Sequence, residues 1–234
     1  MPPEDIPAWW RKPRRITVVV DNPNWILPHA HRLVEEARRA GDHARLLVEL
    51  SAVEPGEIAF FLNCHARVPE AVLARHRRNL VVHASRLPRG RGMSPWVWQI
   101  LEGARVLPLT LFEAVAELDA GPIYRTVEIP LEGHELVDEL RRLIGDAAVD
   151  LCRWFLDSEH PPAARPQIGE PSFYRRRTPE DSRLDPSRSI AEQFELLRVV
   201  DNDRYPAFFD LRGARYLLRI EKVPPDDNRV RDEP

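Results

Sequence analysis

Strand-like and helix-like segments alternate along the first third of this chain. The run Ile16-Thr17-Val18-Val19-Val20 is β-branched, apolar and short, which is typical of a buried strand. We expect strands at 16–20, 45–50, 57–62 and 79–83, and helices at 29–40 and 69–76. Strands that alternate with helices form parallel sheets that the helices cover. The sequence therefore predicts an α/β fold with a Rossmann-like, mostly parallel sheet and helices on both faces.

The loops that follow three of these strands are expected to meet. Segments 21–28, 63–69 and 83–95 each come after a predicted strand. In open parallel sheets, ligands bind beyond the carboxyl ends of the strands. We therefore expect one site built from these three loops.

The pattern changes in the second half of the chain. Segment 107–117 fits a strand or a helix by periodicity, and we favour a strand that runs into a turn. Segment 123–129 alternates apolar and polar residues, as an edge or antiparallel strand does. A long amphipathic helix is expected at 134–156, with an interruption at Gly145.

A smaller unit is expected after this helix. The proline-rich segment 161–166 indicates a linker. Ser189 and Glu192 fit a capping box that opens a helix, and Gly213 marks a hairpin. We expect a larger domain at 1–160, a small C-terminal α+β module with a hairpin at 161–224, and a charged tail at 225–234.

Composition limits the classes of protein that fit this chain. The 234 residues carry a net charge of -3, which argues against a large nucleic-acid surface. No apolar run approaches the roughly 20 residues of a membrane helix, and the acidic start Glu4-Asp5 is unlike a secretory signal. Cys64 and Cys152 lack metal-site spacing, so we expect neither a metal nor a disulfide. These features predict a cytoplasmic protein with no nucleic-acid or membrane partner.

Two motifs place a histidine and an aspartate at candidate strand ends. An apolar run ends on His83 and breaks into a loop that contains Gly90 and Gly92, and Asp119 precedes the turn at Gly121. If both segments end at the same edge of the sheet, the two side chains face one cleft. A carboxylate beside a histidine in a cleft holds an imidazolium ready for reaction. The sequence therefore predicts a His83–Asp119 pair at the centre of the site.

Five segments carry a resemblance to a known family. Segments 83–103, 108–112 and 118–123 resemble the folate-dependent formyltransferases. Segments 173–181 and 197–209 resemble the sugar N-formyltransferase branch, in particular enzymes that act on UDP-linked 4-amino-4,6-dideoxy sugars of the pseudaminic-acid type. The resemblance implies transfer of a formyl group from 10-formyltetrahydrofolate to the amine of a nucleotide-linked 4-amino-4,6-dideoxy sugar, as in cell-surface glycan biosynthesis. Tetrahydrofolate would be the second product.

The resemblance also implies catalytic residues. The family's set is an asparagine, a histidine and an aspartate, and His83 and Asp119 match the last two. The asparagine position holds Val81 here, and loss of one oxyanion donor typically costs about 100- to 1,000-fold in rate. We expect Asn63, at the end of the neighbouring strand, to supply this donor. It is preferred to Asn79, which lies on the same predicted strand as Val81. A backbone amide from the loop after His83 is the other alternative.

The surrounding loops are assigned to the two substrates by the same resemblance. The loop 63–69 resembles the one whose backbone binds the pterin ring. The expected folate contacts are Cys64, His65, Ala66, Val68, Gly90, Gly92, Ala120 and Gly121. The expected acceptor contacts are Asn22, Asn24, Trp25, Ser85 and Arg177. The alternative interpretations are a capped turn at 21–25 and an exposed arginine run at 175–177.

Three other functions share parts of this pattern. A methionyl-tRNA formyltransferase-like enzyme would need a basic surface and a sizeable RNA-binding domain. A formylfolate hydrolase would direct water, through the same His–Asp pair, at the formyl group. An inactive binding homologue would account for Val81. We favour an active formyltransferase with its catalytic domain at 1–160 and a homodimer surface on the C-terminal module.

Overall fold

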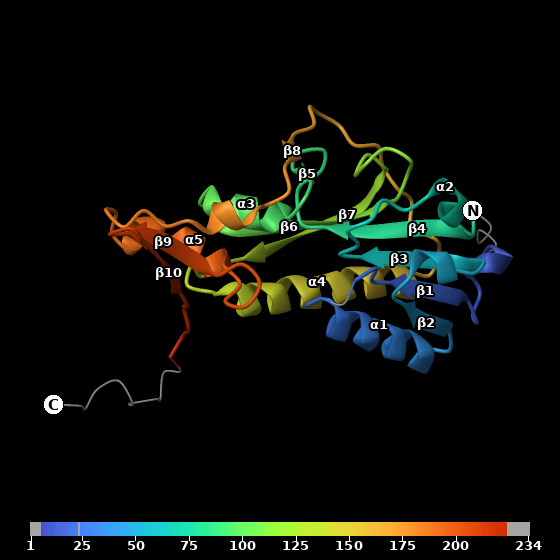
Figure 1. The fold of residues 1–234 in the computed structure, drawn as a ribbon. Helices are drawn as coiled ribbons and strands as arrows, with labels where there is room; N and C mark the ends of the chain where they lie inside the picture. The colour runs from blue at the N-terminus through green and yellow to red at the C-terminus, as the bar shows by residue number, and fades with distance from the viewer. Residues whose placement is uncertain (1–5, 23, 224–234) are drawn as a thin grey trace.

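The computed structural model describes residues 6–22 and 24–223 and has the predicted α/β fold (Figure 1). The strands are β1 (Arg15–Val19), β2 (His43–Leu47), β3 (Gly56–Leu62), β4 (His76–His83), β5 (Arg91–Gly92), β6 (Val106–Glu113), β7 (Ile123–Pro130), β8 (Phe173–Tyr174), β9 (Ala207–Leu211) and β10 (Ala214–Leu218). The α-helices are α1 (Leu27–Arg39), α2 (Glu70–Leu73), α3 (Pro95–Leu101), α4 (Val137–Asp157) and α5 (Phe194–Val199). Within the described ranges, no helix is long and apolar enough to cross a membrane. The tail predicted at 225–234 lies outside these ranges.

The central sheet has the strand order β2-β1-β3-β4-β6-β7. Strands β2, β1, β3 and β4 run parallel, β6 is antiparallel to β4, and β7 is antiparallel to β6. The chain passes from β1 to β2 and then returns to place β3 on the other side of β1. A crevice forms at such a reversal, beyond the carboxyl ends of the strands. The predicted mostly parallel sheet is confirmed, and so is an antiparallel edge strand near 123–129.

Helices α1 and α4 lie together beneath the sheet (Figure 1). They cover the main apolar core, in which full burial of one large side chain contributes about 1.5–3 kcal/mol. Its members include Ile16, Leu33, Phe60, Leu111, Ile144 and Phe155. The opposite face carries a smaller cluster that includes Val19, Phe61 and Val72, the last from α2. The two clusters hold the strand ends at fixed positions between them.

The expected interruption of the long helix at Gly145 is wrong, because α4 is continuous. A Cβ at Gly145 would lie 2.5 Å from ring atoms of His29 in α1. His29 Nδ1 also faces Asp146 at 3.4 Å, and burial lowers the pKa of this imidazole. Glycine at this position therefore permits close approach of two helices and does not end either one.

The C-terminal module lies beside α3 at one end of the sheet (Figure 1). Its hairpin pairs β9 with β10, and the capping-box bonds between Ser189 and Glu192 are present. Its own small core consists of Leu184, Leu197, Val200 and Ala207. The buried Arg198 joins the module to the larger domain through an ion pair of 2.9 Å with Glu135. The module is therefore attached through a specific buried contact as well as through the chain.

Arg165, in the segment predicted as a linker, and β8, which follows that segment, both contact the larger domain. Arg165 exchanges two backbone hydrogen bonds with Ile123, and β8 pairs with β5 in a short parallel ladder. We call residues 161–174 the strap. The division of the chain at residue 160 stays a prediction.

Candidate functional site

The carboxyl ends of β3 and β4 place two predicted residues next to each other. Leu62 of β3 pairs with Val82 of β4, so Asn63 and His83 are the next positions on adjacent strands. His83 is the last residue of β4, and its ring meets Phe112 edge-on. The sheet and this contact therefore fix where the imidazole lies.

The structure brings His83 and Asp119 together. His83 Nε2 lies 3.8 Å from Asp119 Oδ2, and the two side chains are only 10% and 11% exposed. The same Nε2 donates a hydrogen bond of 2.8 Å to the carbonyl oxygen of Gly90. Because a carbonyl oxygen only accepts, Nε2 carries a proton in this arrangement. A positioned imidazole N–H between two oxygen atoms can move a proton or stabilise developing negative charge.

Asp119 is oriented by the backbone of the loop after β4. The N–H of Gly92 donates to Asp119 Oδ2 at 2.8 Å. Asp119 itself has a φ of 51°, in the left-handed region that non-glycine residues seldom adopt. Gly92 approaches β8 so closely that a Cβ would overlap the carbonyl oxygen of Tyr174. Glycine is therefore needed at 92 for the β5–β8 contact, and its amide aligns the carboxylate.

Asn63 forms its side-chain hydrogen bond away from His83. Its Nδ2 donates to Asn24 Oδ1 at 3.1 Å, and its φ is 50°. Val81, where the resemblance leads us to expect an asparagine, packs against the apolar cluster around Phe61. The structure thus directs the Asn63 amide toward the loop after β1, and its substitute role stays a prediction.

Asp21 joins the loops that follow β1 and β3. Its carboxylate accepts hydrogen bonds from the N–H groups of His65 at 2.8 Å and Ala66 at 2.6 Å. In the same loop, Asn24 Nδ2 donates to Asn22 Oδ1 at 2.9 Å. An aspartate directly after a buried strand is the sequence signal that could have identified this contact. The two amides of the 63–69 loop are therefore already satisfied.

Cys64, Val68 and Trp25 place apolar surface at this edge of the sheet. Cys64 Sγ donates to the carbonyl oxygen of Val19 at 3.4 Å, and burial raises the pKa of the thiol to about 12. Val68 packs with Cys64 against the smaller apolar cluster, and Trp25 packs against the main core. A neutral thiol and two apolar side chains suit contact with an uncharged ligand face.

Ser85, Ala120 and Arg177 occupy three different environments. Ser85 is buried, and its Oγ has no hydrogen-bond partner among the described residues. The N–H of Ala120 bonds back within its own loop at 3.4 Å. Arg177 donates to the carbonyl oxygens of Val199 at 3.3 Å and Asp181 at 3.1 Å, and burial lowers the pKa of its guanidinium. In this structure the guanidinium therefore braces the C-terminal module.

Gln167 of the strap is a site residue that the sequence did not point to. Its Nε2 donates to the carbonyl oxygens of Asp119 at 2.7 Å and Gly121 at 2.9 Å. Its Oε1 accepts from Arg91 Nη2 at 2.9 Å, and Arg91 Nη1 in turn binds Glu117 at 2.8 Å. A single glutamine in a proline-rich segment carries no pattern that would single it out.

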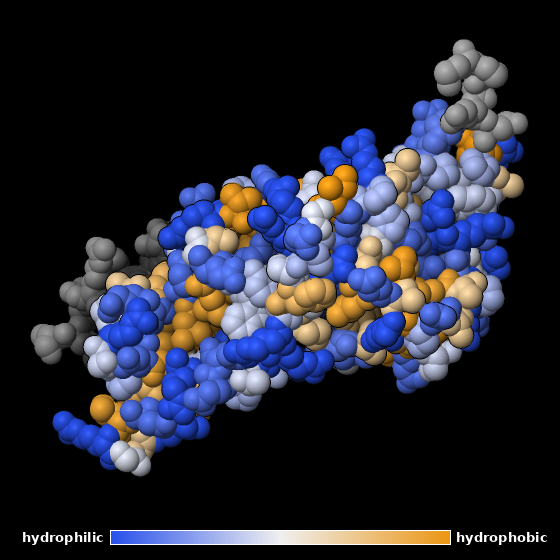
Figure 2. Space-filling model, turned by 90° about the horizontal axis from the view of Figure 1, so that it is seen from above, coloured by the Kyte–Doolittle hydropathy of each residue, from blue (hydrophilic) through white to orange (hydrophobic). Residues whose placement is uncertain are grey.

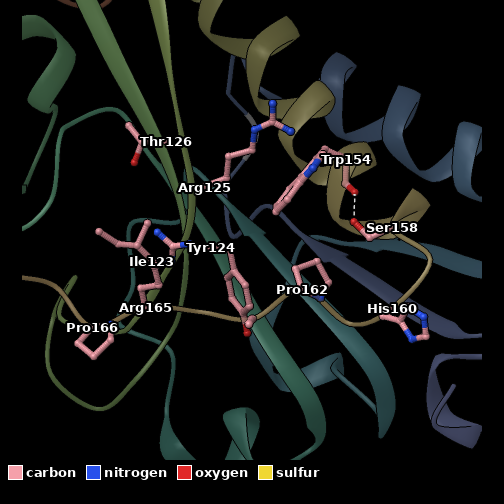
Figure 3. Close-up of a pocket in the computed structure, with 11 residues that line it drawn as sticks. Ile123, Tyr124, Arg125, Thr126, Trp154, Ser158, His160, Pro162, Arg165 and Pro166 are labelled. Atoms are coloured by element: carbon pink, nitrogen blue, oxygen red, sulfur yellow. Dashed lines mark hydrogen bonds between the residues drawn. The ribbon is translucent and has the colours of Figure 1, made fainter. Parts of the chain in front are cut away.

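Two cavities open elsewhere on the molecule. One of about 620 Å³ lies between β7 and the end of α4, where Tyr124 and Trp154 line it (Figure 3). Another of about 1020 Å³ lies between the start of α4 and residues 219–223. Neither is lined by His83 or Asp119. The candidate site is therefore defined by this pair and its loops.

Exposed apolar side chains lie in the segments next to the pair. Figure 2 views the side of the molecule that carries β5 and β8, where hydrophobic patches alternate with hydrophilic surface. Leu118, in the loop of Asp119, is 50% exposed, and Ile168 and Phe173 of the strap are 88% and 62% exposed. Apolar surface beside a few convergent polar groups is typical of a small-molecule site.

Sequence comparison relates the chain to methionyl-tRNA formyltransferases. The chain is 33% identical to the enzyme of Rhizorhabdus wittichii over 165 residues, which cover 67% of this chain and 51% of that protein. It is 30% identical to the enzyme of Novosphingobium aromaticivorans over 158 residues, which cover 67% and 52%. The chain thus spans about half the length of the curated relatives that it matches. No protein-family model matches it.

Solved structures share the fold. Methionyl-tRNA formyltransferase from Clostridium thermocellum matches with a TM-score of 0.76 at 18% identity, covering 91% of this chain and 95% of that one. A sugar N-formyltransferase from a Shewanella species matches with 0.65 at 14%, covering 90% and 99%. HypX from Aquifex aeolicus, in complex with tetrahydrofolic acid, matches with 0.70 at 17%, covering 89% and 38%. At these identities the likeness is one of fold.

Proposed function

Taking this chain as a member of the formyltransferase family, we propose that it transfers a formyl group from 10-formyltetrahydrofolate to the amine of a nucleotide-linked 4-amino-4,6-dideoxy sugar. The observation that carries the proposal is the His83–Asp119 pair. Its Nε2 and Oδ2 atoms are 3.8 Å apart, and both side chains are nearly buried. The pair lies beyond the carboxyl end of β4, where ligands of parallel sheets bind.

The pair supplies what formyl transfer requires of the protein. The acceptor amine loses a proton, the donor nitrogen gains one, and the formyl oxygen becomes negative in between. For this, the N–H of His83 Nε2 would leave the Gly90 carbonyl oxygen and donate to the formyl oxygen, or the imidazole would pass on the amine proton. The Asp119 carboxylate would stabilise the imidazolium. Positioning a desolvated, neutral amine against the formyl carbon would provide much of the remaining rate.

The neighbouring loops fit a flat heterocycle with amide-like edges. Leu118 and Phe173 offer exposed apolar surface. Asp21 already satisfies the amides of His65 and Ala66, so that loop would offer carbonyl oxygens to the N–H groups of the ring. The fold is shared with HypX in complex with tetrahydrofolic acid, which supports tetrahydrofolate as the formyl carrier.

Two kinds of acceptor have support. The fold match covers 99% of the Shewanella sugar N-formyltransferase, and a net charge of -3 is unfavourable for an anionic RNA. These observations favour the amino sugar. The sequence relatives, and the fold match to the methionyl-tRNA formyltransferase from Clostridium thermocellum with its higher TM-score of 0.76, support methionyl-tRNA as the second candidate.

Product mass distinguishes these acceptors. The full chain is incubated with 10-formyltetrahydrofolate and, in parallel, with UDP- or dTDP-linked 4-amino sugars, with methionyl-tRNA, or with no acceptor. We expect a product heavier by one formyl group in the sugar reactions. Formate in the absence of acceptor would indicate hydrolysis, and the absence of any product would contradict enzymatic activity.

The catalytic role of His83 is tested by His83→Asn, with His31→Asn as the matched control. His31 is exposed on α1, outside the site. We expect loss of formyl transfer in His83→Asn while the variant remains folded at the assay temperature, and full activity in His31→Asn. Near-normal transfer by His83→Asn would remove the basis of the proposed mechanism.

We also infer a homodimer through the C-terminal hairpin. Leu211, Tyr216 and Leu217 are exposed apolar side chains on β9 and β10. Light scattering after size-exclusion chromatography tests this proposal. A dimer that Leu217→Glu converts to a monomer supports the hairpin as the interface, and a monomeric wild-type protein contradicts it.

A further inference from the structure

The strap contacts both loops that build the His83–Asp119 pair. On one side, Gly90 N–H donates to Ser172 Oγ and Arg91 N–H donates to the Ser172 carbonyl oxygen, each at 2.9 Å. The Arg91 N–H belongs to the same peptide unit as the Gly90 carbonyl, which accepts from His83 Nε2 at 2.8 Å. The strap therefore holds the peptide group that orients the imidazole.

On the other side, one side chain of the strap holds the loop of Asp119. Both protons of the Gln167 amide are used, on the carbonyl oxygens of Asp119 and Gly121. Its oxygen is used as well, by the guanidinium of Arg91. Gln167 is half-buried, so these bonds are partly shielded from competing water. The glutamine therefore bridges the two loops with every polar atom of its side chain.

Asp119 needs such support because of its own backbone. Its φ of 51° is in a region that usually costs an L-residue about 1–2 kcal/mol, and the surrounding contacts must maintain it. The carbonyl oxygen that Gln167 binds is attached to this strained residue, and the side chain of the same residue accepts from Gly92 N–H. A relaxed backbone would rotate the carboxylate away from His83.

We propose that Gln167 is a positioning residue that keeps the Asp119 carboxylate beside His83 during formyl transfer. This inference rests on the proposed function. Gln167 acts through the two carbonyl oxygens that its amide N–H groups bind, and its contact with Arg91 serves to fix the amide. The essential part of the side chain is therefore the donor group.

Two substitutions separate the donor from the acceptor. Gln167→Ala removes both, whereas Gln167→Glu keeps an acceptor for Arg91 but places a carboxylate against two carbonyl oxygens. We expect both variants to lower kcat by about 10- to 100-fold, with an unchanged KM for the amine, because a displacement near 1 Å is costly in a positioned reaction. Glu170→Gln, exposed on the same strap, is the matched control and should be fully active. Gln167→Glu with wild-type kcat would overturn the proposal.

A second readout follows the carboxylate without relying on turnover. The Gly92 amide is bonded to Asp119 Oδ2, so its hydrogen-exchange rate reports whether the carboxylate is in place. We expect faster exchange at Gly92 in Gln167→Ala and Gln167→Glu, as in Asp119→Ala, in variants that remain folded at the temperature of the measurement. Unchanged protection of Gly92 in both glutamine variants would contradict the proposal.

The two proposals fail in different ways. A wild-type protein that forms no formylated product in any acceptor reaction overturns the proposed function. An active wild-type protein whose Gln167 variants keep full kcat and full Gly92 protection overturns the positioning role alone. A double variant, Gln167→Ala with Asp119→Ala, should be no slower than Asp119→Ala, since residues that act through one another are not additive.

Discussion

Replacement of Gly92 by alanine should destabilise the protein through two separable effects. The first is backbone strain, because the φ of Gly92 is 98° and the left-handed region costs a residue with a Cβ about 1–2 kcal/mol. The second is steric, because the new Cβ would overlap the Tyr174 carbonyl oxygen and push β8 away from β5. That movement disrupts two ladder bonds, from Arg91 N–H to Ser172 and from Met93 N–H to Tyr174, at about 1 kcal/mol each. The expected loss in the free energy of unfolding is therefore about 3–4 kcal/mol.

Gly41→Ala isolates the strain. Gly41 has a φ of 92°, close to that of Gly92, but no heavy atom lies within 4 Å of the position that its Cβ would take. We expect this variant to lose only about 1–2 kcal/mol. Urea unfolding followed by tryptophan fluorescence gives both values. Equal losses in Gly41→Ala and Gly92→Ala would refute the steric contribution and with it the tight β5–β8 contact.

Two further predictions concern buried charged or titratable groups. Burial, with nearby Arg45, lowers the pKa of His76 from 6.5 to about 4, so between these values the unfolded chain binds a proton that the folded chain does not. The free energy of unfolding should therefore fall as the pH drops from 6.5 toward 4, and His76→Gln should flatten this slope in urea titrations; an unchanged slope would contradict the assignment. Arg198→Ala leaves Glu135 without its buried partner and should cost about 3–5 kcal/mol, measured by urea unfolding. Arg39→Ala, exposed on α1, serves as the control, and a loss equal to that of Arg198→Ala would argue against the buried pair.

The fold was largely predictable because its main elements have strong local signals. The β-branched run at 16–20 corresponds to β1, and the segment with helical periodicity at 29–40 corresponds to α1. Both elements lie within a few residues of the expected bounds. The prediction at Gly145 was wrong. A glycine that permits close contact with His29 cannot be distinguished in the sequence from a glycine that ends a helix. Tertiary packing decides which of these two roles a glycine has, and packing cannot be read from a single sequence.

The candidate site was predictable in part. His83 and Asp119 were placed together because His83 ends an apolar run and Asp119 directly precedes a recognisable turn at Gly121. The hydrogen bonds of Asn63 and Arg177 could not be anticipated, since a long polar side chain can reach several partners from one backbone position. The contacts of the strap carry no local signal, because a two-residue strand has no periodicity.

The path of the strap bears on how this polypeptide can be shortened or recombined. A protein that stops after α4 would lose the hydrogen-bond donors of Gln167 and the acceptors of Ser172. The loops that carry Gly90 and Asp119 would then lack these contacts. Hybrids that exchange C-terminal parts between relatives should be joined beyond Tyr174. A junction placed there keeps one parent's loops together with the segment that is hydrogen-bonded to them.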